Sequence, residues 1–211
     1  MESVLKASGT IRQRNEARIL QAAAKQFAKH GFKGTSLQAI ADCVDLPKAN
    51  ILYYFKSKTG LYKALLSDIM DMWNQGFSAD KAQQDPAAVL RTYIEQKMQY
   101  SRSHPLHSKI FAMEIIQGAP NIRDVLERPM IQWTHHQHSV IESWGEQGLM
   151  AKIDPYYLLF MIWGTTQFYA DFDTEITLLK GRELSDDEFL QAQEFTVSTI
   201  LRGLNLAVSS S

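Results

Sequence analysis

The chain has 211 residues, 45% of them hydrophobic, and its 22 Lys and Arg residues nearly balance 23 Asp and Glu residues. This content can fill a packed core, but no stretch reaches the roughly 18 consecutive apolar residues of a membrane span, and Met1–Lys6 lacks the apolar core of a signal peptide. The single cysteine, Cys43, excludes an internal disulfide and a cysteine-based zinc site. We therefore expect a cytoplasmic protein without a membrane partner, with Cys43 as a small buried side chain.

The first predicted helix runs from about Thr10 to His30. Ile19, Ala23 and Phe27 recur four residues apart on one face of it, and Gly31 is its stop signal. This periodicity predicts a helix packed on a core through that face.

Two short helices are predicted next. Thr35 and Gln38 form a capping-box pattern that opens a helix over Leu37 to Cys43. Asp45 falls where the chain must turn, and aspartate tolerates the left-handed conformation better than most residues. Pro47 suits the first turn of the following helix, which ends near Phe55.

The rest of the chain also has helical periodicity. Ser57 caps a fourth helix, whose apolar side is made by Leu61, Leu65, Ile69, Met72 and Trp73. Start and stop signals predict a fifth helix from Asp85-Pro86 to His104-Pro105 and a sixth from there to about Gln117. The seventh covers about 121–147, with a break or kink at Pro129. The eighth begins at Asp154-Pro155, and the ninth runs from a capping box at Ser185–Glu188 to about Asn205. No alternating β-branched run predicts a strand. The fold class is therefore expected to be all-α, with about nine helices.

Charge is distributed unevenly along the chain. Residues 1–63 carry 11 Lys and Arg against 4 Asp and Glu, a net charge of +7, whereas residues 64–211 carry 11 against 19, a net charge of −8. A polyanion partner for the first part is the natural interpretation, and a chance fluctuation of solvated charge is the alternative. The sign changes within the fourth helix, which divides the chain into domains 1–60 and 61–211.

Two short helices joined by a tight turn let the second helix enter a DNA groove while neighbouring groups hold phosphates. Lys48 can donate to guanine, and Asn50 can pair with adenine or contact phosphate. Ile51 and Phe55 are the inward anchors. The DNA-binding residues predicted on this basis are Thr35, Ser36, Pro47, Lys48, Ala49, Asn50, Tyr53, Tyr54 and Lys58, of which Lys58, Thr35 and Ser36 stand at helix starts that favour phosphate.

The same segment resembles the helix-turn-helix signature of TetR-family transcriptional repressors. Ile40–Asp42 and Leu46–Lys58, with their Tyr-Tyr-Phe-x-Ser-Lys run, and the spacing to Phe27–Phe32 carry the resemblance, which covers about residues 16–63. It departs from the family at Asp45, where Gly is common, and at Pro47, where Ser is usual. The resemblance implies a three-helix DNA-binding domain, a helical ligand-binding and dimerisation domain, and a homodimer that binds double-stranded operator DNA.

A narrower resemblance is to the RutR branch of that family, which regulates pyrimidine utilisation and senses uracil or thymine. Asn50–Phe55, Met72-Trp73, Met113–Pro120 and Phe160–Phe172 carry it, whereas the segment 175–186 and the first fifteen residues match poorly. The resemblance implies a small-molecule effector, with uracil or thymine as the first candidates.

One face of the predicted eighth helix could hold such a ligand. Phe160, Trp163, Gly164, Gln167 and Asp171 are three or four residues apart and share a side. The Gln167 amide complements the N–H and C=O edge of an imide, and Trp163 or Trp73 could stack on its ring. The predicted ligand-binding residues are therefore Trp73, Trp163, Gln167 and Asp171, with no cofactor. The alternative is that these side chains form ordinary core.

The last helix carries Phe189, Phe195, Ile200 and Leu204, which the family resemblance assigns with the eighth helix to a two-fold dimer interface. Packing on an internal core would give the same pattern. His135 and His138 can share a helical face, but no third ligand accompanies them, so no metal is expected.

No phosphate-binding loop or catalytic signature occurs, so an enzyme is not expected. Two further functions stay open: a repressor that responds to an unrelated small molecule, and a non-specific architectural DNA-binding protein.

Overall fold

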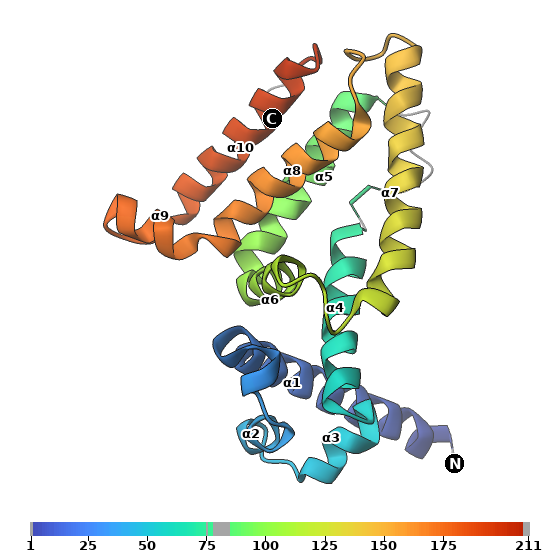
Figure 1. Ribbon diagram of the computed structural model, residues 1–211, viewed down its shortest axis with the longest axis vertical. Helices are drawn as coiled ribbons and strands as arrows, with labels where there is room; N and C mark the ends of the chain where they lie inside the picture. The colour runs from blue at the N-terminus through green and yellow to red at the C-terminus, as the bar shows by residue number, and fades with distance from the viewer. Residues whose placement is uncertain (1, 75, 78–84, 209–211) are drawn as a thin grey trace. The chain divides into compact units, whose positions relative to one another are not determined.

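The computed structural model describes residues 2–74, 76–77 and 85–208. Within these residues the chain forms ten helices and no strand, which confirms the expected all-α fold (Figure 1). Their contacts divide the chain into two compact units: unit 1 contains Met1–Ile69 and Lys109–Arg123, and unit 2 contains Met70–Ser108 and Asp124–Ser211. In the described part of the chain, the helices are all too short or too polar to cross a membrane.

Unit 1 holds the first helices of the chain: α1 (Glu2–Gly34), α2 (Leu37–Cys43) and α3 (Lys48–Phe55), with parts of α4 (Lys58–Asn74) and α6 (Pro105–Ile116). The predicted stop at Gly31 is a break inside α1, where the backbone has φ 66° and ψ 176°. Glycine is suited to this position because it adopts positive φ without steric cost.

The core of unit 1 forms where the periodicity of α1 predicts it. Ile19, Ala23 and Phe27 are all buried. The Phe27 ring packs edge-on against the Tyr62 ring of α4 at 4.8 Å between centroids, and the Phe32 ring lies 4.9 Å from the same tyrosine. Edge-to-face contacts at this distance add to the stability from burial, so α1 and the first turns of α4 hold each other in place.

A buried carboxylate joins α4 to the end of α6 within unit 1. The Tyr62 hydroxyl donates to Glu114 at 3.0 Å. Glu114 also accepts from the backbone N–H of Asn121 at 2.7 Å and from its side-chain amide at 3.1 Å. Burial, followed by the charge of Glu114, raises the pKa of Tyr62, which therefore stays protonated and able to donate.

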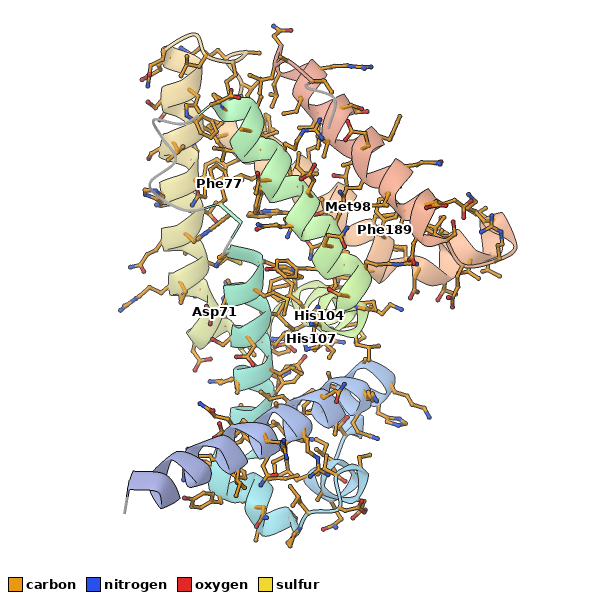
Figure 2. All side chains as sticks on the ribbon, turned by 180° about the vertical axis from the view of Figure 1, so that it is seen from behind. Asp71, Phe77, Met98, His104, His107 and Phe189 are labelled. Carbon is orange, nitrogen blue, oxygen red and sulfur yellow. The ribbon has the colours of Figure 1, made fainter. Side chains whose placement is uncertain are left out.

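Unit 2 contains α5 (Pro86–Ser103), α7 (Arg123–Glu146), α8 (Pro155–Asp171), α9 (Asp173–Lys180) and α10 (Asp186–Gly203). Helices α5, α8 and α10 pack together (Figure 1). Phe77 and Met98 lie inside this unit (Figure 2), where the Phe77 ring stacks on Trp144 of α7 at 5.9 Å. An ion pair from Arg91 of α5 to Glu194 of α10, 2.7 Å long, ties two of the helices at the surface.

Several predicted helix starts are confirmed. Asp85 caps α5, Asp154 caps α8, and Ser185 caps α10 through a complete capping box with Glu188. Each of these side chains accepts from a backbone N–H that has no partner inside its own helix. Ser57 likewise accepts from the Gly60 N–H at 2.9 Å, one turn into α4.

Helix α9 was not predicted. It spans eight residues and includes three β-branched side chains, Thr174, Ile176 and Thr177, which have low helix propensity. Tertiary and terminal interactions stabilise it instead. Gly181 ends it in the left-handed conformation, and Lys180 pairs with Glu188 at the start of α10.

Replacing Tyr62 by Phe removes the donor to Glu114 and leaves a buried carboxylate oxygen with one partner fewer. We expect the free energy of unfolding to fall by about 1 to 3 kcal/mol, because a buried acceptor loses a hydrogen bond without regaining water. Chemical denaturation followed by tyrosine and tryptophan fluorescence measures the change. Tyr157→Phe, at an exposed tyrosine, is the matched control; equal stability of the two variants would contradict the prediction.

Candidate functional site

Helices α2 and α3 form a helix-turn-helix. Ile40 and Ala41 of α2 and Ile51 of α3 are fully buried. Between the helices, the backbone N–H groups of Val44 and Leu46 both donate to the Ala41 carbonyl. This packing fixes α3 against the rest of unit 1, so the burial of Ile51 decides which face of α3 points outward.

Asp45 has φ 52°, which confirms the expected left-handed turn residue. Aspartate is one of the few side chains that adopts this conformation at low cost. The turn therefore forms with Asp45 where the family commonly has glycine.

The outer face of α3 is polar and aromatic. Its exposed residues are Lys48, Ala49, Leu52 and Tyr53, and Lys56, the C-cap residue that follows the helix, is exposed as well. Asn50 is half-buried, and Pro47 is exposed at the N-cap position. Leu52 was not singled out from the sequence, because its spacing fits a core position as well as a surface one. On this face it offers an apolar contact of the kind that recognises a thymine methyl group.

Tyr54 is half-buried between α3 and α1. Its hydroxyl accepts from the Asn15 side chain at 3.4 Å, and the Arg12 guanidinium lies 5.9 Å from its ring centre. Tyr53, the neighbouring residue, is 64% exposed. The two predicted tyrosines therefore differ: Tyr53 presents its ring to solvent, whereas Tyr54 is held in place by α1.

The predicted capping box at the start of α2 is wrong. Ser36 is the N-cap, and its hydroxyl accepts from the Ala39 N–H at 3.0 Å. Thr35 is only 3% exposed, and its hydroxyl donates to the carbonyl oxygens of Gln26 and Gly31. The Thr35 side chain thus supports the end of α1 and does not lie on the surface, whereas Ser36 does.

The Lys58 side chain also makes hydrogen bonds inside unit 1. Its ammonium donates to the carbonyl oxygens of Phe32 and Thr35, both at 2.9 Å, and lies 4.6 Å from the centre of the Phe32 ring. An ammonium has three N–H donors, and two of those of Lys58 are used inside unit 1. Cys43, expected to be buried, is exposed, with its sulfur accepting from the Gln26 amide at 3.3 Å.

Unit 2 contains a buried lysine that the sequence did not indicate. Lys97 of α5 is 3% exposed, and its ammonium lies over the ring of Trp73, 4.4 Å from the centre. Burial lowers the pKa of Lys97 to about 7, and the charge of Asp171 on α8 partly opposes this. Lys97 therefore brings together two predicted ligand residues, Trp73 and Asp171, that lie far apart in the sequence.

Trp163 belongs to an aromatic cluster in the same unit. Its indole N–H donates to the Tyr93 hydroxyl at 2.9 Å, and Trp133 of α7 lies 6.4 Å away between ring centres. Gln167 lies one turn further along α8 and is half-buried. Trp163 and Asp171 are half-buried as well, whereas Phe160 and Gly164, predicted to share this face, are exposed, with the Phe160 ring 5.8 Å from that of Trp163.

Two buried polar atoms of unit 2, Gln137 Oε1 and His107 Nδ1, have no hydrogen-bond partner among the described residues. The Gln137 amide donates to the Phe77 carbonyl at 3.1 Å, but its buried oxygen accepts no hydrogen bond from the described residues. His107 lies beside His104, 5.3 Å between ring centres (Figure 2), and burial followed by His104 lowers the pKa of His107. Such groups are costly unless something binds them.

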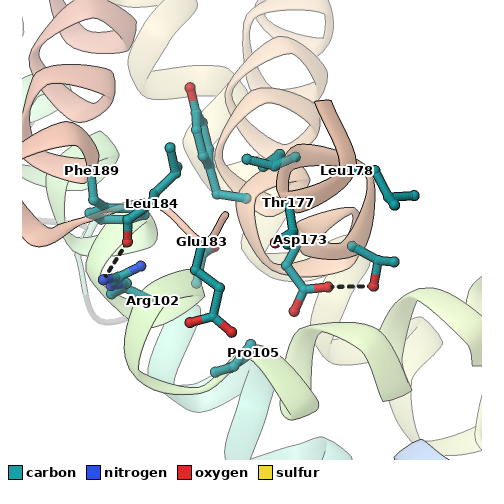
Figure 3. A pocket seen from close by; sticks show the side chains of 12 residues that line it. Arg102, Pro105, Asp173, Thr177, Leu178, Glu183, Leu184 and Phe189 are labelled. Carbon is teal, nitrogen blue, oxygen red and sulfur yellow. Dashed lines mark hydrogen bonds between the residues drawn. The ribbon is translucent and has the colours of Figure 1, made fainter. Parts of the chain in front are cut away.

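A cavity of about 540 Å³ lies elsewhere in unit 2, between the ends of α5 and α8, α9 and the start of α10 (Figure 3). Arg102 is held at its wall by the Leu184 carbonyl at 3.1 Å and by Asp186 at 2.8 Å. None of the four predicted ligand residues lines this cavity.

Helices α8 and α10 share an exposed apolar surface. Three of the four α10 residues predicted to face a second copy, Phe189, Ile200 and Leu204, are instead buried in the core of unit 2, because α10 packs on α5. The exposed apolar side chains here are Tyr157, Phe160, Met161, Phe168, Phe172, Leu190 and Phe195. Surfaces of this kind mark sites of protein association.

The histidine-rich run of α7 has ordinary contacts. The His138 ring lies 4.7 Å from that of Tyr156, and His138 Nδ1 is 3.8 Å from Glu142. His135 and His136 are exposed. Among the described residues, no group of three or more side chains could hold a metal ion.

The helix-turn-helix with its basic outer face defines a DNA-binding regulator of transcription. Residues 19–65 match the family model of bacterial regulatory proteins of the tetR family, and residues 66–207 match that of the C-terminal region of YcdC-like proteins. The HTH-type transcriptional regulator RutR of Escherichia coli (strain K12) is 38% identical to the chain over 187 residues, 88% of each sequence. The chain belongs to the TetR family.

Two solved structures share the fold. AibR in complex with isovaleryl coenzyme A and operator DNA has a TM-score of 0.65 and 18% identity, covering 87% of this chain and 96% of that chain. HlyIIR, a hemolysin II transcriptional regulator, has a TM-score of 0.63 and 22% identity, covering 92% and 98%.

Replacing Lys97 by Met tests its burial through the pH dependence of stability. The pKa is lowered to about 7 in the folded chain but is about 10.4 in an unfolded one, so the unfolded chain binds more protons between these pH values. The stability of the natural chain relative to Lys97→Met should therefore rise between about pH 7 and about pH 9, by at most ~1.4 kcal/mol per pH unit. Urea unfolding at both pH values measures it; a difference between the two chains that does not change with pH would contradict the prediction.

Proposed function

We propose that the chain acts as a homodimeric repressor that binds operator DNA through α3 and is released by a small ligand, with uracil or thymine as the first candidates. The observation that carries the DNA part is the outer face of α3, which presents Lys48, Ala49, Leu52 and Tyr53 together. A helix this short enters the major groove by its N-terminal turns. Lys48 and Asn50 are the residues proposed to contact base edges, with Tyr53, Tyr54 and Ser36 on the backbone.

The exposed apolar surface of α8 and α10 supports a dimer. A dimer with two-fold symmetry would bring two copies of the helix-turn-helix to half-sites about one helical turn of DNA apart. Repression and release then depend on the separation between the two α3 helices.

The buried polar groups of unit 2 support a ligand that presents both donors and acceptors. The Lys97 ammonium can donate to a carbonyl oxygen, and the Asp171 carboxylate can accept from a ring N–H. A pyrimidine imide carries these groups side by side, and the Gln167 amide complements the same edge. Its flat ring could stack on the indole of Trp163 or of Trp73.

A ligand held there would act on α4. This helix is continuous from Lys58 to Trp73, so it begins in the DNA-binding unit and ends at a residue proposed to touch the ligand. We propose that contact at Trp73 displaces α4 and with it the helix-turn-helix, which changes the spacing of the two recognition helices.

The specificity of α3 is tested at Asn50 and Lys48. Asn50→Ala and Lys48→Ala should each weaken binding to the operator more than binding to random DNA, by about 1 to 3 kcal/mol at the contacted base pair, because base-edge contacts carry sequence information. Competition between the operator and random duplexes measures this. Equal losses on both duplexes would reassign the residue to the DNA backbone, and a natural chain without preference would favour an architectural DNA-binding protein.

The effector is tested by calorimetric titration with uracil and with thymine. Gln167→Leu should weaken binding of the base roughly tenfold or more, because a ligand N–H or C=O loses its partner in a buried site. Gln132→Leu, at an exposed position of α7, should leave binding unchanged. If neither base released or absorbed heat on titration, the pyrimidine proposal would fail and an unrelated effector would be favoured. The proposal of DNA binding would be unaffected.

A further inference from the structure

The residue after α3 has a strained backbone. Lys56 has φ 67° and ψ −39°, and the Ser57 N–H donates to the Phe55 carbonyl at 2.7 Å across it. This is a three-residue γ-turn with positive φ, a rare and strained form. Glycine would adopt positive φ without the penalty, which is about 1 to 2 kcal/mol for other residues. The turn itself therefore does not require a lysine side chain at this position.

The Lys56 side chain lies on the outer face of α3. Its ammonium donates to the Tyr53 carbonyl at 3.1 Å and lies 5.7 Å from the centre of the exposed Tyr53 ring. Lys56 is exposed at the C-terminal end of α3, as Lys48 is at the N-terminal end. An exposed contact of this kind contributes little to stability, so the ammonium can leave the Tyr53 carbonyl and bind an anion instead.

The same surface continues from α3 to α1. The Tyr53 and Tyr54 rings pack edge to face at 5.3 Å, and beyond them the Arg12 guanidinium lies 5.9 Å from the Tyr54 ring centre (Figure 1 shows α3 beside α1). Arg12 is also fixed by Glu16, 3.0 Å away on the same helix, and remains largely exposed. Lys56, Tyr53, Tyr54 and Arg12 thus form a continuous cation-aromatic strip, with Lys56 at one end and Arg12, paired with Glu16, at the other.

We propose that this strip is a DNA-backbone clamp, in which Arg12 and Lys56 each bind one phosphate and the tyrosines between them pack on the sugar-phosphate chain. The proposal rests on DNA binding by α3 and adds Arg12 and Lys56, which are not among the DNA-binding residues predicted from the sequence. Arginine and lysine side chains beside hydroxyl groups are the usual ligands of DNA phosphates, and such contacts position the protein without selecting sequence. Arg12 would extend the contact from the helix-turn-helix onto α1.

The decisive variant is Lys56→Gly, because glycine suits the backbone while removing the charge. We expect its melting temperature to equal or exceed that of the natural chain, while its affinity falls about tenfold for operator and random duplexes alike. The slope of log affinity against log salt should become shallower by about 0.9 for each lost contact in each protomer. Arg12→Gln should give the same shift, and Lys56→Arg should restore the slope.

Fluorescence anisotropy with both duplexes over a series of salt concentrations measures these quantities, with Lys152→Gln as the control that removes an equal charge from unit 2. An unchanged slope for Lys56→Gly and Arg12→Gln overturns the proposal, whether or not stability changes, and leaves Lys56 as a cap of its own helix. A loss confined to the operator also overturns it, because it would mean base contact. If the natural chain itself bound neither duplex, DNA binding by α3 would fail first, which is a distinct outcome.

Discussion

The burial of Ile51 is the constraint on which the DNA-binding surface depends. Helix α3 has eight residues, well below the length at which an isolated helix is stable in water. Its conformation and orientation therefore come from packing against Ile40 and Ala41 of α2 and from the turn at Asp45. Once Ile51 is buried, helical geometry places Tyr53 on the opposite side of α3, and Lys48 in the first turn and Lys56 just after the last turn are exposed as well. The buried aromatic contacts of Phe27 and Phe32 with Tyr62 hold this arrangement on α4.

Unit 2 differs from unit 1 in that polar side chains are buried in its interior. Lys97 and the Gln137 oxygen are removed from water, which is costly for an ammonium and for an unpaired amide acceptor. Ordinary core residues at these positions would make a more stable unit. The ligand site proposed above would account for this cost, because functional sites are where a protein departs from the most stable packing.

Much of this fold follows from local rules. The α1 face of Ile19, Ala23 and Phe27 and the caps at Asp85, Asp154 and Ser185 depend on residues close in sequence, and all are found as predicted. The errors have a different origin. Helix α9 depends on Gly181 and on the pair between Lys180 and Glu188, which outweigh its poor intrinsic propensity.

Other errors concern exposure, which depends on neighbours distant in sequence. Cys43 has an apolar-periodic context but faces outward, and Phe189, Ile200 and Leu204 are buried because α10 packs on α5. Lys97 could not have been found from its own surroundings in the sequence, since nothing in a helix of mixed polarity distinguishes a buried lysine from a solvated one. Only the packing of Trp73 and Asp171 beside it reveals its place.

Cross-linking from Ala49 would show most directly whether the outer face of α3 meets base edges. With Cys43 replaced by Ser to remove the exposed thiol, Ala49→Cys is mixed with operator duplexes that carry a disulfide-tethered base in the major groove. We expect a cross-link at one or two base positions in each half-site, and none from Gln132→Cys on α7. Binding of the duplex without any cross-link from residue 49 would mean that a different surface of the chain meets the DNA.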